Sequence, residues 1–386
     1  MTRRGGFRPG QRRRQPSPST TASAPTPQRA TTQVEQLTSE GLAVTVRLDP
    51  GNEGSPYPAT VRFVGHRTDV SGKRTPADSF TKDERIERVV PGSGPVSVTT
   101  WAYHLNPGAW EVTAELIRSP FAAPAPARPK GARGHTLPRA TWSWSRWRLV
   151  DAPYGAVRTS SGIAARLSSV PAVIHGSWSA LVVLGIVVGT LVQILLLGRQ
   201  GIEAWQVILV TAVAVAAGLL GAKVWYAVLR PRQWRRSLGE GWSVDGSIVA
   251  APLAGLLVIL ALGLPPLAFL DASAPAFFVG VAIGRLGCFF TGCCAGRCTA
   301  SRFAIWSSDR RIGARRVPTQ LLESAIGLVL GVLATFLFLN DIPPVDGGIF
   351  VGGVATYLVA RQFLLRLRAD PRASSISMER AATPAE

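Results

Sequence analysis

Residues 274–298 read Ala-Pro-Ala-Phe-Phe-Val-Gly-Val-Ala-Ile-Gly-Arg-Leu-Gly-Cys-Phe-Phe-Thr-Gly-Cys-Cys-Ala-Gly-Arg-Cys. The stretch is apolar as far as Phe290, and all four cysteines of the chain fall within its last eleven residues. The apolar run predicts a helix inside a membrane, and the closely spaced glycines predict a tight backbone turn at its polar end. We therefore expect the chemistry of this protein at that end.

The four thiols allow three interpretations: a metal site, a redox cluster, or a turn built from small residues. Structural zinc sites usually take two separated pairs of ligands, whereas Cys293 and Cys294 are adjacent and every histidine lies upstream. This spacing argues against a metal site. Thiol redox chemistry is a minor alternative because adjacent cysteines form only a strained disulfide. Buried thiols that pack as small apolar side chains remain the alternative for each cysteine.

Apolar segments dominate the second half of the chain and predict a polytopic α-helical membrane protein with about six transmembrane helices. Most are long enough to cross about 30 Å of hydrocarbon, and the fourth is the shortest. The net charge of +19 could suggest a nucleic-acid partner, but arginines flank these apolar segments rather than line a binding helix or a finger, which argues against one. The predicted spans are Trp178–Leu197, Val207–Leu229, Ser247–Leu270, Ala274–Phe290, Leu321–Leu339 and Gly347–Leu365.

The first half of the chain predicts a soluble β domain. Period-two alternation, as in Trp110-Glu111-Val112-Thr113-Ala114, recurs between turns such as Asn106-Pro107-Gly108 and is typical of a small β-sandwich. The first residues are rich in Arg, Pro, Ser and Thr and lack the apolar core of a signal peptide. The expected organisation is a disordered basic tail at 1–33, a β-sandwich-like domain at 34–118, a Pro/Ala/Arg/Trp linker at 119–173, the transmembrane domain at 174–368 and a disordered tail at 369–386.

Three tryptophans at the end of this linker, Trp142, Trp144 and Trp147, form a cluster next to arginines. Tryptophan is enriched at the level of lipid headgroups, which is one interpretation. Packing of the cluster against the β-sandwich is the other.

Charged side chains inside the spans are few, and each marks a functional site by default. Arg285, Glu323 and Arg361 belong to the fourth, fifth and sixth spans. Because guanidinium groups suit bidentate recognition of phosphate, we expect a pocket for an anionic lipid headgroup. Lys223 and Asp245 stand near span ends, where snorkelling to the interface is an equal alternative.

The polar end of the quoted stretch resembles the signature of the bacterial prolipoprotein diacylglyceryl transferases. That signature, Gly-Arg-x-Gly-Asn-Phe-x-Asn-Gly-Glu followed by Gly-Arg, is similar to residues 284–293 with Gly296-Arg297, and one branch of the family carries Gly-Cys-Cys in place of Gly-Glu. Supporting similarities follow the family's order and extend the resemblance over about residues 174–368. They are Trp178, Gly221-Ala222-Lys223-Val224-Trp225-Tyr226, Pro318-Thr319-Gln320-Leu321-Leu322-Glu323, and Tyr357 with Arg361.

The resemblance implies an enzyme that moves the diacylglyceryl group of phosphatidylglycerol to the thiol of a lipobox cysteine on a preprolipoprotein, without metal or cofactor. It implies a multi-pass protein of the plasma (inner) membrane, with these substrates and membrane lipids as partners. It implies catalytic positions at Arg285, Asp245 and Arg361, the two arginines holding the phosphate. The implied substrate-binding residues are Gly284, Gly287, Gly292, Cys293, Cys294, Gln320, Glu323, Tyr226, Trp178 and Tyr357.

Two departures from the family keep a second function open. The family's His-Gly-Gly appears as Asp245-Gly246-Ser247, and its late glutamate appears as Leu365. An ordinary carboxylate, with a pKa of about 4, is a poor base for a thiol with a pKa of about 8.5, although burial raises a carboxylate's pKa. The alternative is a non-catalytic lipid- or lipoprotein-binding membrane protein derived from the family.

The orientation in the membrane also has two interpretations. Arginines cluster after the second span, at 230–236, and before the fifth, at 310–316. The positive-inside rule then predicts both termini in the cytoplasm. The family resemblance instead implies that the signature faces outward.

Overall fold

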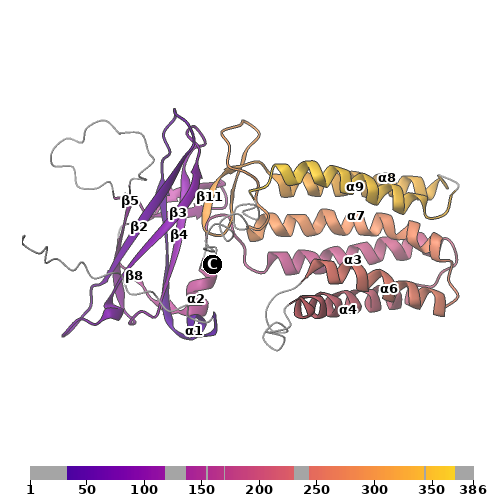
Figure 1. The fold of residues 1–386 in the computed structure, drawn as a ribbon, viewed down its shortest axis with the longest axis horizontal. Helices are drawn as coiled ribbons and strands as arrows, with labels where there is room; N and C mark the ends of the chain where they lie inside the picture. The colour runs from indigo at the N-terminus through magenta and orange to yellow at the C-terminus, as the bar shows by residue number, and fades with distance from the viewer. Residues whose placement is uncertain are drawn as a thin grey trace, which may run out of the picture.

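The protein has a β part and a helical part, which lie end to end along the long axis (Figure 1). The computed structural model describes residues 33–117, 136–153, 155–168, 170–229, 243–342 and 345–369. The predicted disordered tails fall almost entirely outside these residues, at 1–32 and 370–386, as does the basic segment 230–236.

Two antiparallel sheets form the β part, with strand orders β10-β11-β4-β1-β9 and β3-β2-β5-β8. Alternate side chains of β1 (Glu40–Leu48) are buried, because successive residues of a strand point to opposite faces. They share one core with Phe63 of β2 and Trp110 of β5, both fully buried. The predicted β-sandwich is confirmed. Its other strands are β2 Tyr57–Arg67, β3 Ser79–Val89, β4 Val96–Tyr103, β5 Ala109–Ile117, β8 Val157–Arg158 and β9 Ser160–Ser161, with the short helices α1 Gln33–Thr38 and η1 Pro76–Asp78.

The sandwich is completed by a hairpin from the membrane part of the chain. β10 (Ile305–Ser308) and β11 (Ile312–Arg316) pair with each other, and β11 pairs with β4 so that Ile312 lies opposite Val98. The Gly313 amide donates to the Ser97 hydroxyl at 3.1 Å, which fixes this junction. A domain that ends at residue 118 is therefore wrong, because a sheet edge accepts any extended segment that reaches it, however distant in sequence.

The predicted linker at 119–173 also contains regular structure. It holds β8, β9, the hairpin of β6 (Ala140–Ser143) and β7 (Arg148–Asp151), and the helix α2 (Gly162–Leu167). The linker prediction is wrong for this part. Proline and alanine are concentrated ahead of residue 136, outside the described residues, whereas the later part has its own buried apolar residues, such as Ala140 and Leu149.

The linker tryptophans pack on residues of the membrane part. The Trp142 ring stacks on Trp306 of β10 with a centroid separation of 4.4 Å, and Trp147 stacks on Phe289 at 6.0 Å. Trp147 Nε1 also donates to the Trp306 carbonyl at 3.1 Å. The packing interpretation therefore holds: the packing surface is β10 together with Phe289, near the end of α7 (Pro266–Thr291), which carries the signature residues and is called the signature helix below.

Six long helices among the described residues run side by side in the second part (Figure 1). Five of them are long and apolar enough to cross a membrane, and α6 is a shorter apolar helix, so the chain is a multi-pass membrane protein. The helices are α3 Ser177–Gly198, α4 Ala204–Val228, α6 Val244–Ala261, α7 Pro266–Thr291, α8 Thr319–Leu339 and α9 Gly348–Arg366.

The third and fourth predicted spans differ from the observed helices. The third was expected to reach Leu270, but α6 ends at Ala261 and Gly263 takes a left-handed backbone with φ of 66°. Pro266 then starts α7, because proline is tolerated in the first turn of a helix. The fourth helix therefore has 26 residues and is the longest of the six, not a short span.

α7 is central to the helical part and packs against α3, α8 and α9. Glycine permits the close approach of α3 to α7: a Cβ added to Gly189 of α3 would lie 2.8 Å from the Ala276 carbonyl oxygen of α7. The chain direction alternates, so the starts of α3, α6 and α8 and the ends of α4, α7 and α9 all face the β part (Figure 1). The polar end of the signature helix therefore lies against the β-sandwich.

Candidate functional site

Four side chains predicted for the site meet at one carboxylate oxygen. Glu323 Oε1 lies 2.8 Å from Arg285 Nη2 and 2.5 Å from Arg361 Nη1, and it accepts a hydrogen bond from the Tyr357 hydroxyl at 2.7 Å. The Glu323 side chain is 5% exposed, whereas those of Arg285 and Arg361 are 17% and 31% exposed. We call these four residues the Glu323 site. Its carboxylate is enclosed, and its two guanidinium groups retain access from outside.

Three helices bring these residues together. Arg285 comes from α7 and Glu323 from the first turns of α8, while Tyr357 and Arg361 lie one turn apart on one face of α9. Two guanidinium groups share a single carboxylate, so the site carries one excess positive charge. An uncompensated charge in a poorly hydrated place is unfavourable. A phosphodiester monoanion would neutralise it and accept charge-assisted hydrogen bonds.

The start of α8 holds the turn that follows the signature helix. Gln320 is 2% exposed and donates from Nε2 to the Cys293 carbonyl at 2.9 Å, and the Thr319 hydroxyl donates to the Cys294 carbonyl at 3.3 Å. Gly292 ends α7 with φ of 71°, the left-handed conformation that glycine adopts without strain. Gln320 and Gly292 therefore shape the turn rather than contact the Glu323 carboxylate.

The two signature glycines on α7 have different neighbours. A Cβ on Gly287 would lie 3.0 Å from the Trp178 Cα and 3.2 Å from the Ser177 carbonyl oxygen, so glycine here allows α3 and α7 to touch. A Cβ on Gly284 would make an ordinary contact of 3.8 Å with Val182. The structure thus shows a packing reason for Gly287, and substrate binding at either glycine stays a prediction.

Asp245, Tyr226 and Trp178 lie on helices other than the three that build the Glu323 site. Asp245 is exposed in the first turn of α6, where the Ser243 hydroxyl donates to its Oδ2 at 3.4 Å. Tyr226 is half-buried on α4, and Trp178 is 48% exposed at the start of α3. None of the hydrogen bonds described for Arg285, Glu323 or Arg361 involves Asp245. A catalytic role for Asp245 stays a prediction.

Sequence reasoning missed the residues that close the end of α7. Arg310 donates from Nε to the Thr291 carbonyl at 2.9 Å, and the Ser177 and Thr291 hydroxyls lie 2.7 Å apart. The sequence did offer one signal, the adjacent Arg310 and Arg311, since cations stabilise the carboxyl end of a helix. These contacts bind the signature helix both to α3 and to the β10–β11 hairpin.

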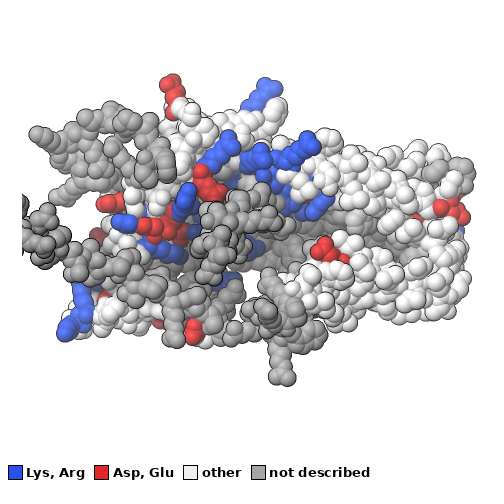
Figure 2. All heavy atoms as spheres, in the orientation of Figure 1, with Lys and Arg blue, Asp and Glu red and all other residues white. Residues whose placement is uncertain are grey.

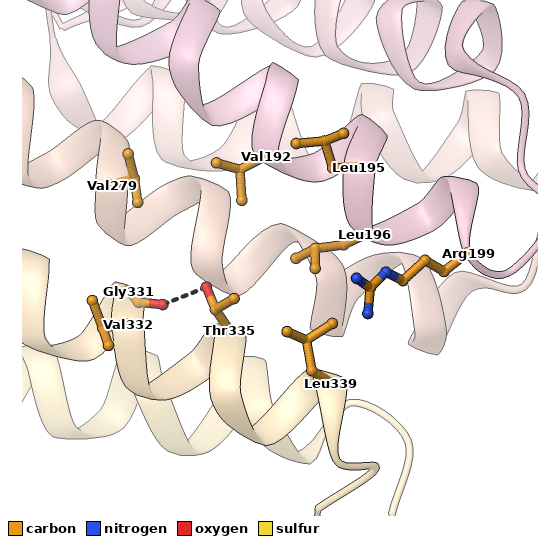
Figure 3. A pocket seen from close by; sticks show the side chains of 9 residues that line it. All are labelled: Val192, Leu195, Leu196, Arg199, Val279, Gly331, Val332, Thr335 and Leu339. Atoms are coloured by element: carbon orange, nitrogen blue, oxygen red, sulfur yellow. Dashed lines mark hydrogen bonds between the residues drawn. The ribbon is translucent and has the colours of Figure 1, made fainter.

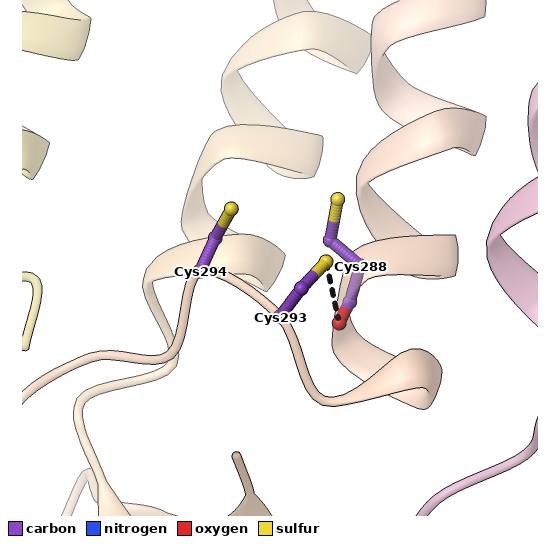
Figure 4. Close-up of side chains that lie close together, drawn as sticks. All are labelled: Cys288, Cys293 and Cys294. Atoms are coloured by element: carbon purple, nitrogen blue, oxygen red, sulfur yellow. Dashed lines mark hydrogen bonds between the residues drawn. The ribbon is translucent and has the colours of Figure 1, made fainter. Parts of the chain in front are cut away.

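Three of the four cysteines come together beside this turn (Figure 4). Their Sγ atoms, from Cys288 on α7 and from Cys293 and Cys294 after it, all lie within 4.8 Å of one another. The Cys293 thiol donates a hydrogen bond to the Cys288 carbonyl oxygen at 3.7 Å (Figure 4). The absence of a metal stays a prediction. The turn at Gly292 nevertheless brings the adjacent Cys293 and Cys294 close to Cys288, a grouping that the spacing did not suggest.

A groove on the side of the bundle lies between α3, α7 and α8 (Figure 3). Its volume is about 300 Å³, and Arg199 is the charged residue in its lining. The groove belongs to the halves of α3 and α8 that are remote from the β part, so it is separate from the Glu323 site. The lining residues are Val192, Leu195, Leu196, Arg199, Val279, Gly331, Val332, Thr335 and Leu339.

Basic side chains gather where the helices meet the β part, while the sides of the helices are largely uncharged (Figure 2). Arginines of the 297–316 segment and Arg368 belong to this junction. Basic side chains beside an apolar surface favour contact with anionic headgroups.

The family of the chain follows from its match to known sequences. The family model of prolipoprotein diacylglyceryl transferase matches residues 167–383. The chain belongs to this family. The resemblance drawn from the signature is thereby confirmed, and the match begins just before α3, so nearly all of the β part precedes it.

Relatives in the prolipoprotein diacylglyceryl transferase family are distant. The phosphatidylglycerol–prolipoprotein diacylglyceryl transferase 2 of Clostridium perfringens is 26% identical over 211 residues, covering 51% of this chain and 80% of that protein. The corresponding transferase of Clostridium tetani is 24% identical over 210 residues, or 52% and 83% of the two chains. That of Gloeobacter violaceus is 30% identical over 214 residues, or 50% and 77%.

Proposed function

We propose that this protein transfers the diacylglyceryl group of phosphatidylglycerol to the thiol of a lipobox cysteine on preprolipoproteins at the plasma membrane. The observation that carries the proposal is the Glu323 site, in which Arg285 and Arg361 share one buried carboxylate. Family membership supports the reaction type, and the excess positive charge supports the anionic lipid.

The Glu323 site suits the leaving group of this reaction. The substrate thiolate attacks the glyceryl carbon that carries the phosphate, the carbon–oxygen bond breaks, and the electron pair leaves with glycerol phosphate. Negative charge grows on the phosphate as this bond breaks, so arginines fixed before the reaction stabilise the transition state more than the bound lipid. Glu323 and Tyr357 fix the Arg361 guanidinium, and Glu323 fixes that of Arg285.

Replacement of Arg285 tests this proposal. Arg285→Ala should lower transfer to a lipobox peptide by about 100-fold or more, the usual effect of removing a donor to a developing anion. Arg285→Lys should restore little, because a point charge does not replace a planar fork. Arg199→Ala is the matched control, since Arg199 lies at the groove remote from the Glu323 site. Unchanged phosphatidylglycerol binding and transfer in the Arg285→Ala protein would refute the proposal.

A lipid- or lipoprotein-binding protein without catalysis is the second candidate, and the exposed position of Asp245 favours it. If Asp245 is the base for the thiol, Asp245→His should raise transfer, because an imidazole with a pKa of about 6.5 accepts a proton better near neutral pH. If the protein only binds lipid, both proteins should bind phosphatidylglycerol and neither should transfer it. The measurement is transfer in vitro with phosphatidylglycerol vesicles and a synthetic lipobox peptide.

A further inference from the structure

The thiols of Cys288, Cys293 and Cys294 have the spacing of a metal ligand set. Their Sγ atoms lie within 4.8 Å of one another, and Figure 4 shows the three side chains turned toward a common space. Zinc bound to thiolates at about 2.3 Å in a tetrahedron requires sulfur atoms about 3.8 Å apart. Sulfur separations of up to 4.8 Å would therefore shorten by about 1 Å around a bound zinc ion.

The surroundings prepare these thiols to bind a cation. Gln320 and Thr319 hold the carbonyls of Cys293 and Cys294, so the turn keeps both thiols near Cys288. Cys288 is buried and the other two are half-buried, which limits competition from water. Three thiolates and one zinc ion carry a net charge of −1, and Arg368, a cation outside the Glu323 site, acts electrostatically on Cys294 and would offset it.

We propose that Cys288, Cys293 and Cys294 bind one zinc ion whose fourth position takes the thiol of the substrate cysteine. Catalytic zinc sites have three protein ligands and one open position, whereas structural sites have four protein ligands. The fourth cysteine of this chain, Cys298, packs instead against the sandwich core, and its backbone pairs with Arg316. The described residues therefore offer three thiols and leave the fourth position for a ligand.

The zinc site rests on the proposed transferase function and gives it a means of activating the thiol. A thiol that coordinates zinc loses its proton, which passes to solvent, and becomes the thiolate nucleophile. Cys288 lies three residues after Arg285, on the same face of α7, so the bound sulfur and the phosphate-binding arginine are about one helical turn apart. Such an arrangement needs no histidine at position 245.

Metal content of the full-length protein, purified in detergent under reducing conditions, tests the ligand set. The wild-type protein and the matched control Cys298→Ser should each hold one zinc ion per chain. Zinc binding should weaken by more than about 100-fold in each of the variants Cys288→Ser, Cys293→Ser and Cys294→Ser. Loss of a residue that only supports a ligand weakens metal binding by about 10- to 100-fold. Absence of any metal from the wild-type protein would refute the assignment and favour the expectation, drawn from the cysteine spacing, that no metal is bound. Stoichiometric copper or iron in place of zinc would also refute it.

The fourth position is tested separately, without turnover. Cobalt(II) in place of zinc gives thiolate charge-transfer absorption that grows with each added sulfur ligand. A synthetic lipobox peptide should raise this absorption, and the same peptide with serine for its cysteine should not. An identical response to both peptides would show that the substrate thiol does not reach the metal.

A transfer assay then separates this inference from the proposed function. Removal of zinc with a chelator should stop transfer and leave Arg285-dependent binding of phosphatidylglycerol intact, and added zinc should restore transfer. Transfer at an unchanged rate by metal-free protein would refute the zinc site and leave the transferase proposal standing. Zinc and peptide bound without transfer by the wild-type protein would refute the transferase proposal and leave the metal site standing. Because this assay uses wild-type protein, it does not depend on folding of the serine variants.

Discussion

Glu323 determines the electrostatics of the candidate site, since both arginines pair with its one oxygen. Removing its charge would leave Arg285 and Arg361 unneutralised in a poorly hydrated place. Breaking a buried ion pair by removing one partner lowers the free energy of unfolding by about 3–5 kcal/mol. Because the two arginines are partly exposed and therefore partly screened by solvent, we expect Glu323→Gln to lower the free energy of unfolding by about 3 kcal/mol, the lower end of this range.

Tyr357→Phe is the matched comparison, because it removes a hydrogen bond to the same oxygen without changing charge. A hydrogen bond to a charged group contributes about 1.5–3 kcal/mol, so we expect this variant to unfold at a temperature between those of the wild type and Glu323→Gln. Thermal unfolding in detergent measures both variants. Added phosphatidylglycerol should narrow the gap for Glu323→Gln, because the phosphate supplies the missing negative charge. Equal unfolding temperatures for the two variants would contradict the charge argument.

Among the helices, α9 depends on a carboxylate from α7. Asp271 is 7% exposed and accepts hydrogen bonds from the backbone amides of Gly347 at 2.7 Å and Phe350 at 3.0 Å. These amides belong to the start of α9 and have no partner within the helix. The predicted spans leave Asp271 in the connection between the third and the fourth, whereas it lies inside α7 and caps α9.

Asp271→Ala should therefore lower the free energy of unfolding by about 1–2 kcal/mol, the usual effect of losing an amino-terminal cap. Asp346 is the control, because it is exposed in the same connection and has no described hydrogen bond to the start of α9. Thermal unfolding of Asp271→Ala and Asp346→Ala in one detergent gives the comparison. A loss of stability in both variants would show that the connection, rather than the cap, is responsible.

The hairpin of β10 and β11 is held on the sandwich by a buried carboxylate. Glu84 of β3 accepts a hydrogen bond from Thr100 at 2.9 Å and pairs with Lys82 and with Arg311 of the hairpin. Burial opposes ionisation of Glu84, but the hydrogen bond from Arg311 and the charge of Lys82 outweigh it and lower its pKa. Because the pKa of Glu84 is lower in the folded protein than in the unfolded chain, its ion pairs stabilise the fold fully at pH values above the unfolded-state pKa of about 4.3.

Docking of the hairpin should consequently weaken as the pH falls from about 4 through the lowered pKa of Glu84, because the carboxylate then takes up a proton and loses its charge. Hydrogen exchange at the amides of β11, measured between pH 7 and pH 3.5 with correction for intrinsic exchange, reports this loss. Glu84→Gln should already exchange faster at pH 7 and should lose the acid dependence. An acid dependence that persists in Glu84→Gln would assign the effect to another group.

On the scale of the whole molecule, the β part covers the end of the bundle that carries the signature. The β11–β4 pairing and the Trp147–Phe289 stack connect the two parts directly. Any partner that reaches the Glu323 site from the aqueous phase therefore passes the junction of sandwich and helices. Under the proposed function, an anionic substrate that takes this route would meet the arginines of the junction first.

The same arrangement predicts the side of the membrane on which the β part lies. If lipoprotein substrates reach the site from outside, Ser145→Cys in the β6–β7 turn should react with an impermeant maleimide in intact cells. Gln200→Cys, in the connection at the opposite end of the bundle, should react only after lysis. The unsubstituted protein gives the background from its native thiols. The reverse pattern would favour the orientation predicted by the positive-inside rule, and equal labelling of both would contradict the fold.

Much of this architecture could be predicted from the sequence, because it depends on local patterns. Apolar runs mark membrane helices whatever they pack against, and period-two alternation in β1 and β5 marks a half-buried sheet. The sequence identified Arg285, Glu323 and Arg361 as candidates because a charge inside a membrane span is energetically costly and therefore usually serves a function. The end of α6 and the start of α7 were not, since Gly263, Pro265 and Pro266 divide one continuous apolar region.

Only the tertiary structure decided which of these residues meet. The approach of Arg285, Tyr357 and Arg361 to one oxygen of Glu323 depends on how three helices are rotated and spaced, which no periodicity records. The pairing of β11 with β4 joins segments more than 200 residues apart through backbone groups that every residue carries. The grouping of three thiols arises from a left-handed turn at Gly292 that brings adjacent cysteines over a third. Local sequence therefore determined the elements and the residue types, and long-range packing determined the site.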